Sequence, residues 1–185
     1  MNRLPVVSLN YRLSKLDNGG QPLVQHPAHD QDVVDALLYL LSEDCSCPTT
    51  SFTIIGHSCG AFLACSAAAN PSIKPYVKAL ICLDGIYNLS YLKEEYPDYS
   101  SFLEQAFGKD ELRWPKLDHK ALDGIPILVA HSREDELLSL KQPREFYAML
   151  GERKVDTVFN ADTLKGKHDE LLDQEEVLFL VLEAF

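Results

Sequence analysis

The chain has 185 residues, enough for one domain with a sizeable core, and its hydrophobic fraction of 46% is that of an ordinary globular protein. Its formal net charge of −11 argues against a nucleic-acid or membrane partner, because a surface that binds phosphates needs clustered Lys and Arg. No apolar run approaches the roughly 20 residues of a membrane span, and from the first residues we expect no signal peptide.

The five cysteines predict a reducing compartment. They are odd in number, and Cys59, Cys65 and Cys82 lie in apolar segments that are typical of a buried core. Cys45 and Cys47 form a Cys-x-Cys pair, but no second Cys/His pair stands at the spacing of a zinc site. We therefore expect reduced thiols, no metal ion and a cytoplasmic location.

The first segments of the chain predict a strand, a loop and a helix. Residues 5–11 have the apolar, β-branched character of a strand, and residues 12–25 form a polar loop. A helix is expected to open at residues 26–30, with Pro27 in the tolerated first turn. Its apolar face consists of Val33, Val34, Leu37, Leu38, Leu40 and Leu41.

The next stretch carries a motif for nucleophilic catalysis. Residues 53–55 predict a short buried strand, and residues 61–69 predict a helix of small and apolar side chains. Between them stands Gly56-His57-Ser58-Cys59-Gly60, the G-x-S-x-G pattern in its required context of strand, turn and helix. Ser58 is therefore the predicted nucleophile. The alternative is a serine that caps a helix after a tight turn.

The two glycines of the motif are expected to let neighbouring backbone approach closely. With Gly56 and Gly60 at its ends, a strained turn would expose the hydroxyl of Ser58 above the sheet. It would then lie at the positive end of the following helix, where negative charge on a substrate oxygen is stabilised. The backbone N–H of Cys59 is the expected oxyanion-hole donor.

The remaining elements alternate. Strands are predicted at 77–83, 126–131 and 155–159, and helices at 143–150 and 175–184. Near-continuous apolar strands that alternate with helices are typical of a parallel sheet covered on both faces. We predict a single α/β domain over residues 1–185, with a doubly wound, mostly parallel sheet.

One segment, about 86–122, interrupts the alternation because it has no strand signal and many aromatic residues. A connection of this length is usually functional, so we expect a helical cap over the carboxyl ends of the strands, where open α/β sheets bind ligands. Most of its aromatics are expected to hold the cap on the body. Tyr87, Tyr91 and Trp114 are the candidates for substrate binding.

A serine nucleophile needs a base and a carboxylate that orients the base. His168 fits the base because it follows the last predicted strand in a loop, and the order Ser, acid, His is the one used on this kind of fold. His131 ends a strand and could orient a loop. Asp135, after the strand at 126–131, is the expected acid, with Glu134 and Asp84 as alternatives.

Several motifs resemble the hormone-sensitive-lipase-like esterases of the α/β-hydrolase fold. They are Tyr11-Arg12-Leu13-Ser14, His26-Pro27-Ala28 with Asp32-Val33, and Gly56-His57-Ser58-Cys59-Gly60-Ala61. Within that group, further segments resemble kynurenine formamidases (arylformamidases), particularly fungal ones: Leu83-Asp84-Gly85-Ile86-Tyr87-Asn88-Leu89, Glu94-Glu95-Tyr96-Pro97-Asp98-Tyr99, and Ala106-Phe107-Gly108 followed by Trp114.

The resemblance implies a hydrolase that converts N-formylkynurenine to kynurenine and formate in tryptophan catabolism. It implies a Ser-Asp-His triad without metal or organic cofactor, and Ser58, Asp135 and His168 match its three positions. The expected partner is a small molecule, N-formylkynurenine or a small ester, and the sequence leaves a homodimer open.

The sequence departs from this family in one respect. The family carries a His-Gly-Gly motif that supplies oxyanion-hole donors, whereas this chain has a glycine pair only at Gly19-Gly20. The expectation is a shortened member of the family. Either the natural chain is longer, or the strand at 5–11 pairs directly with the strand at 53–55.

Two other functions remain open from the sequence. One is a carboxylesterase of broad specificity, and the other is an inactive ligand-binding or interaction protein built on the hydrolase body.

Overall fold

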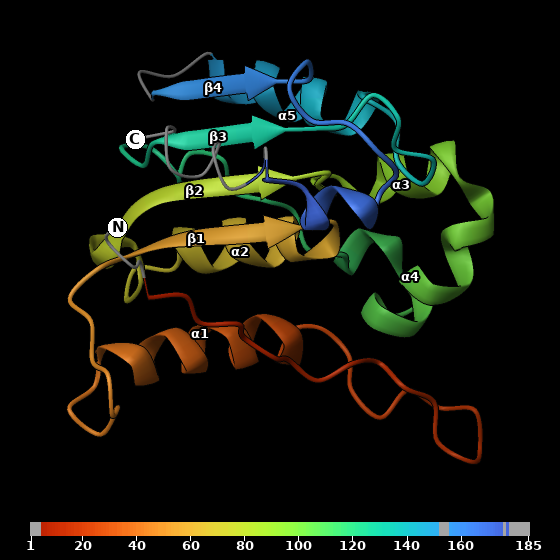
Figure 1. The fold of residues 1–185 in the computed structure, drawn as a ribbon. Coiled ribbons are helices and arrows are strands. Elements are labelled where there is room, and N and C mark those ends of the chain that lie inside the picture. The colour runs from red at the N-terminus through yellow and green to blue at the C-terminus, as the bar shows by residue number, and fades with distance from the viewer. Residues whose placement is uncertain (1–4, 152–155, 176, 178–185) are drawn as a thin grey trace.

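The computed structural model describes residues 5–151, 156–175 and 177. Four strands in this part of the chain form one parallel sheet in the order β1-β2-β3-β4 (Figure 1). Their bounds are Phe52–His57, Val77–Leu83, Ile127–Ala130 and Thr157–Asn160. The α-helices are α1 Ala28–Leu41, α2 Cys59–Ala69, α3 Leu89–Glu95, α4 Ser100–Phe107 and α5 Lys141–Gly151. The predicted α/β class with a parallel sheet is confirmed.

The alternation of side chains along the strands divides the core between two faces of the sheet. Leu80 of β2 lies on the face that packs against α2 and α5, in the largest hydrophobic cluster. Ile81, the next residue, lies on the opposite face and packs with Leu164 and Leu171. Because both faces are covered, β2 and β3 are apolar along almost their whole length.

Most elements form where the sequence predicts them, with small shifts at their ends. The strand expected at 126–131 is Ile127–Ala130, and the one expected at 155–159 is Thr157–Asn160. The helix expected at 143–150 begins two residues earlier, at Lys141. Apart from residues 175 and 177, the closing helix predicted at 175–184 lies outside the described residues.

The strand predicted at 5–11 is wrong. This segment forms no strand ladder, and the side chains of Val6 and Val7 are 88% and 57% exposed. Leu9 and Tyr11 instead pack at the edge of the main core, so the segment is held by side chains rather than by backbone hydrogen bonds. The direct pairing with β1 that the sequence left open does not form within the described chain. An apolar, β-branched composition alone does not make a strand without a partner.

The segment between β2 and β3 contains α3, α4 and two 3₁₀ turns, Pro97–Tyr99 and Glu111–Arg113. These helices lie beyond the arrowheads of the strands, at the carboxyl end of the sheet (Figure 1). They form a second hydrophobic cluster in which Leu92, Leu103 and Trp114 pack with Phe62 of α2. Hydrophobic contacts therefore attach the insertion to the helix that follows the G-x-S-x-G motif.

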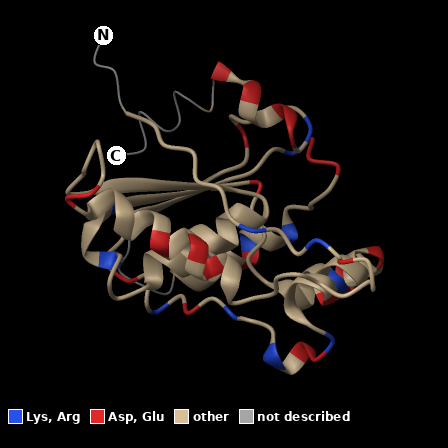
Figure 2. Cartoon of the chain, turned by 90° about the horizontal axis from the view of Figure 1, so that it is seen from below, with Lys and Arg blue, Asp and Glu red and all other residues tan. Residues whose placement is uncertain are grey.

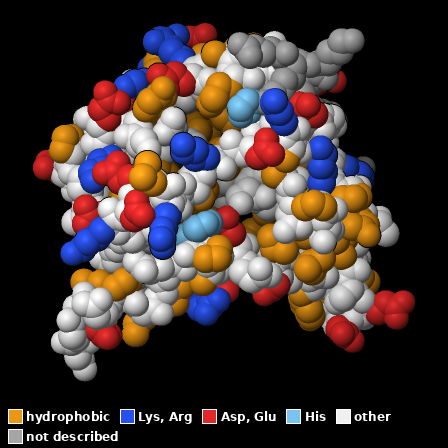
Figure 3. All heavy atoms as spheres, turned by 180° about the vertical axis from the view of Figure 1, so that it is seen from behind, with side chains coloured by type: hydrophobic (Ala, Val, Ile, Leu, Met, Phe, Trp, Pro, Cys, Tyr) orange, Lys and Arg blue, Asp and Glu red, His pale blue; other side chains and the backbone are white. Residues whose placement is uncertain are grey.

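Charged residues lie mainly on the helices and loops, and the strands are almost free of them (Figure 2). In the view from behind, charged side chains are frequent on the side that carries α3 and α4, and hydrophobic side chains gather at the lower right (Figure 3). No helix among the described residues is long and apolar enough to cross a membrane.

The backbones of β1 and α2 approach each other closely at Gly56. A Cβ atom at this position would lie 2.3 Å from the backbone oxygen of Gly60, whereas a Cβ on Gly60 would meet nothing within 4 Å. The prediction that the absence of a side chain allows close backbone approach is therefore confirmed at Gly56. It is wrong at Gly60, where a side chain would have room. The approach that matters is that of the Gly60 backbone to the α-carbon of Gly56.

This geometry predicts opposite effects for two alanine substitutions. Gly56→Ala is expected to lower the free energy of unfolding by roughly 3 kcal/mol or more, because the obstructing atoms are backbone. Gly60→Ala, in the first turn of α2, should leave it unchanged or raise it by about 0.5–1 kcal/mol. Urea unfolding of both variants checks this. Equal losses would contradict the assignment of the constraint to Gly56.

Candidate active site

Ser58 lies in a strained turn between β1 and α2. Its φ of 55° and ψ of −124° place a residue other than glycine in a conformation that such residues rarely adopt. The turn is held by backbone hydrogen bonds: the N–H of Ser58 donates to Leu83, and its carbonyl oxygen accepts from Ala61 and Ile86. In the described part of the chain, the hydroxyl of Ser58 has no hydrogen-bond partner. The turn therefore presents, at the start of α2, a hydroxyl that no described residue engages.

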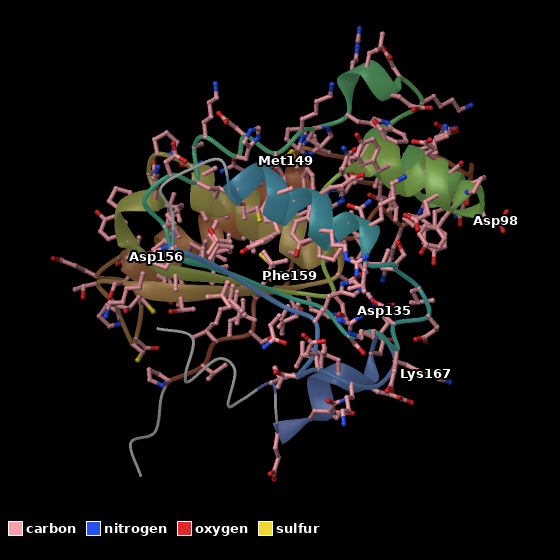
Figure 4. All side chains as sticks on the ribbon, turned by 90° about the horizontal axis from the view of Figure 1, so that it is seen from above. Asp98, Asp135, Met149, Asp156, Phe159 and Lys167 are labelled. Atoms are coloured by element: carbon pink, nitrogen blue, oxygen red, sulfur yellow. The ribbon has the colours of Figure 1, made fainter. Side chains whose placement is uncertain are left out.

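The sheet brings His168 and Asp135 together from two different connections. Nδ1 of His168 lies 2.8 Å from Oδ2 of Asp135. The other carboxylate oxygen, Oδ1, accepts the backbone N–H groups of Leu137 and Leu138 at 2.8 and 2.9 Å. Figure 4 shows Asp135 and Lys167, the neighbour of His168, close together at the end of the sheet opposite to Asp156. His168 is thus held in one orientation by a buried carboxylate.

This pair changes the proton affinity of both groups. Burial by itself would lower the pKa of His168, but the hydrogen bond and the negative charge of Asp135 outweigh it and raise that pKa above its ordinary value. Burial would likewise raise the pKa of Asp135. Its hydrogen bonds to His168, Leu138 and Leu137 reverse this and lower it. A charged Asp135 therefore favours a protonated His168.

The two alternative acids have other partners. Glu134 accepts the backbone N–H of Gly166 at 2.9 Å, and Asp84 accepts that of Ser132 at 2.7 Å. Of the three carboxylates, Asp135 is the one whose hydrogen bond to the ring of His168 is seen among the described residues. Asp84 is buried, its Oδ2 has no partner there, and burial raises its pKa to about 7.

Two further histidines surround this pair. His131 is fully buried, lies 3.4 Å from Oδ2 of Asp135, and has Nε2 3.1 Å from the carbonyl oxygen of Leu138. This matches the expectation that it could orient a loop. His57, which the sequence placed only inside the turn, has Nε2 3.0 Å from the carbonyl oxygen of His168. Nothing in the spacing of the motif predicted that contact.

The same side chains carry donor atoms of the kind that bind metal ions. His57, Asp84 and His168 offer ligand atoms within 4.8 Å of one another, and so do Asp84, His131 and Asp135. One ring nitrogen of each histidine already has a hydrogen-bond partner in the protein, whereas Nδ1 of His131 has none among the described residues. The absence of a resident metal stays a prediction.

A cavity of about 430 Å³ opens beside the turn. Cys59, directly after Ser58, lines it, and the hydroxyl of Tyr11 lies 3.3 Å from the Cys59 sulfur. Apolar side chains from α2, α3 and α4 and the segment before α3 form much of the wall: Phe62, Leu63, Ile86, Leu89, Phe102, Leu103 and Phe107. His26, His29 and Asp30 add polar groups. The cavity therefore reaches the residue that follows Ser58 and has a largely hydrophobic wall, while Ser58 and His168 are not among its lining residues.

The three aromatics selected from the sequence lie outside this cavity lining. Tyr87 is buried and stacks on Phe146 at a centroid distance of 4.1 Å. Trp114 is buried in the second cluster, where its indole N–H donates to Gly108 at 2.8 Å. Tyr91 is 38% exposed beside the ammonium group of Lys141. Phe102 and Phe107 were expected to hold the insertion on the body, and no sequence signal separated them from the other aromatics.

The raised pKa of Asp84 gives a pH dependence that stability measurements can detect. Between about pH 4 and pH 7 the folded chain keeps a proton on Asp84 that the unfolded chain has lost, so the free energy of unfolding falls as pH rises through this window. Asp84→Asn keeps an oxygen that can accept the hydrogen bond from the N–H of Ser132, and it removes the carboxyl group that titrates. We expect its Tm to exceed that of the unaltered chain by at least about 2 °C at pH 8, or about 1 kcal/mol.

At about pH 4 the two chains should unfold at nearly the same temperature. Asp98→Asn, at an exposed position, is the matched control and should show no such difference. A parallel pH dependence of Asp84→Asn and the unaltered chain would contradict the assignment.

Comparisons with known proteins agree with the fold and identify relatives, although no protein-family model matches the chain. Kynurenine formamidase from Meyerozyma guilliermondii is 33% identical over 95% of this chain and 70% of its own length. The same enzyme from Scheffersomyces stipitis is 31% identical over 96% and 75%, and the one from Eremothecium gossypii 32% over 92% and 74%.

Among solved structures, an acylaminoacyl peptidase from Pyrococcus horikoshii has a TM-score of 0.64 at 21% identity, over 84% of this chain and 27% of its own. A lipase/esterase from Lactobacillus plantarum has a TM-score of 0.62 at 16% identity, over 94% and 71%. These structures support the α/β-hydrolase fold, and the sequence relatives show the family. The chain is a hydrolase that belongs to the kynurenine formamidase family.

Proposed function

We propose that this chain hydrolyses N-formylkynurenine to kynurenine and formate, with Ser58, His168 and Asp135 as its catalytic triad. The observation that carries the proposal is the pair of Asp135 and His168, held 2.8 Å apart next to a strained turn with a free serine hydroxyl. The names of the sequence relatives support the choice of substrate.

In the first half of the reaction, Oγ of Ser58 attacks the formyl carbon while Nε2 of His168 takes the hydroxyl proton. The oxygen of the resulting tetrahedral intermediate carries the negative charge. It accepts a hydrogen bond from the backbone N–H of Cys59 at the start of α2. His168 then gives its proton to the aryl nitrogen, the C–N bond breaks, and kynurenine leaves the formylated serine.

In the second half, His168 removes a proton from water as the water oxygen attacks the formyl carbon. The intermediate collapses, the proton returns to Oγ of Ser58, and formate leaves. Asp135 stays ionised throughout and stabilises the imidazolium each time it forms, which the raised pKa of His168 supports.

The cavity beside Cys59 is proposed to hold the aromatic ring of the substrate. Its volume of about 430 Å³ lies within the range of small-molecule sites, and its wall of apolar and aromatic side chains suits an aryl group. Seven lining residues belong to the segment 86–122: Ile86, Leu89, Phe102, Leu103, Gln105, Ala106 and Phe107. We therefore assign this segment as a cap that contributes to substrate binding.

Replacing the nucleophile gives the direct test. Ser58→Ala is expected to lower kcat on N-formylkynurenine on the order of 10⁴- to 10⁶-fold, because neither acylation nor proton transfer can occur. Release of kynurenine and formate is the measurement, and Ser72→Ala, an exposed serine, is the control.

The unaltered chain should also react with a fluorophosphonate at Ser58. Hydrolysis of p-nitrophenyl acetate without turnover of N-formylkynurenine would select the broad-specificity carboxylesterase. A folded chain that neither labels nor turns over would select the inactive binding protein.

Substitution of the three carboxylates tests the choice of acid. Asp135→Asn is expected to lower kcat roughly 10³- to 10⁴-fold, since His168 loses the group that orients it and stabilises its cation. Loss of that charge also lowers the pKa of His168, so the acid limb of the kcat/KM profile should move to lower pH. Asp84→Asn and Glu134→Gln should stay within about tenfold of the unaltered chain. A larger loss in either variant than in Asp135→Asn would refute the assignment.

A further inference from the structure

The backbone of His168 is held on both sides of its α-carbon by side chains from distant segments. Its N–H donates to the carboxylate of Glu136 at 2.9 Å. Its carbonyl oxygen lies 3.0 Å from Nε2 of His57. Since a carbonyl oxygen has no proton to donate, the proton of this hydrogen bond must be on Nε2 of His57. Both peptide groups that flank the proposed base are therefore fixed, in addition to its ring.

These contacts come from different parts of the molecule. The loop 161–169, which carries His168, makes hydrogen bonds with five side chains: Ser132 and Arg133 donate to it, and the carboxylates of Glu134, Asp135 and Glu136 accept from it. All of these residues belong to the connection between β3 and α5. The base and its acid are thus tied into one unit at the ends of β3 and β4.

His57 belongs to the other side of the site. It is the last residue of β1, directly before Ser58, and its ring centroid lies 4.6 Å from that of His168. Among the side-chain hydrogen bonds between described residues, it supplies the one that joins the loop 161–169 to β1. Burial, and then the neighbouring His168, lower the pKa of His57, which keeps it a neutral donor.

We propose that His57 is a positioning residue, whose Nε2–H fixes the Asp135–His168 unit at the correct distance from the hydroxyl of Ser58. The proposal rests on the role of His168 in the proposed function. Without the hydrogen bond from His57, Asp135 and His168 would keep their own contact while their distance from the nucleophile relaxed. A displacement of about 1 Å between reacting groups can reduce a rate roughly 10²-fold, so the effect belongs in kcat.

Two carboxamide substitutions form the matched test, because the amide nitrogen of Gln lies near the place of Nε2 and that of Asn near the place of Nδ1. His57→Asn is expected to lower kcat on N-formylkynurenine by about 10- to 100-fold, with KM changed by less than about twofold. His57→Gln should stay within about threefold of the unaltered chain. His119→Asn, at a histidine that does not line the cavity, should have no effect.

The pH dependence of kcat/KM distinguishes a change in the position of His168 from a loss of its contact with Asp135. Because Asp135 keeps its bond to His168, the acid limb of His57→Asn should coincide with that of the unaltered chain. Equal kcat values for His57→Asn and His57→Gln, or a loss expressed in KM alone, would overturn the proposal.

Nitrogen-15 NMR of the unaltered chain tests the contact without any variant and without activity. His57 should carry its proton on Nε2, and the signal is assigned by its disappearance in His57→Gln. A proton on Nδ1 alone overturns the proposal, even if His57→Asn does not fold. If the chain turns over no substrate and does not label, the proposed function fails, and the position of this proton still decides whether His57 holds the loop.

Discussion

The close approach of β1 and α2 at Gly56 is the constraint on which the site depends. The backbone of Gly60 occupies the space that a side chain at position 56 would need. The first turn of α2 therefore packs directly against the end of β1. The chain must then reverse within a single residue, and Ser58 takes the strained φ of 55°. A conformation of this kind costs about 1–3 kcal/mol and persists only where packing enforces it. Here the buried α2 supplies that packing, with Ala61, Cys65 and Ala68 almost inaccessible to solvent.

The parallel sheet determines which side chains collect at the end of the sheet where Ser58 lies. Parallel strands end at a common edge, and residues from or just after these ends collect there. His57 ends β1, Asp84 follows β2, His131 follows β3, and His168 lies in the loop after β4. Two carboxylates at this end of the sheet, Asp135 and Asp84, differ in charge because their environments differ. Asp135 accepts three hydrogen bonds and stays ionised, whereas Asp84 is buried with fewer partners and keeps its proton until about pH 7.

Much of this arrangement could be predicted from the sequence, because its signals are local. The strand, turn and helix around Ser58, the apolar strands at 77–83 and 126–131, and the positions of Asp135 and His168 after strands all follow from short patterns. The strand at 5–11 could not be judged this way, since pairing depends on a partner elsewhere. The cavity wall was missed for a similar reason: whether Phe102 or Trp114 faces a cavity depends on how α4 packs against α2. The contact of His57 with His168 joins residues 111 positions apart and has no local signature.

The exposed side of β1 bears on how the molecule behaves at high concentration. Within the described chain β1 pairs only with β2, and Ile55 on this strand is 47% exposed. An open strand edge with apolar side chains is a template for self-association. The net charge of −11 opposes it, because molecules of like charge repel one another in dilute electrolyte. At about 1 M salt the screening length falls to roughly 3 Å, and that repulsion no longer separates the edges. Colloidal stability should therefore decline as ionic strength rises.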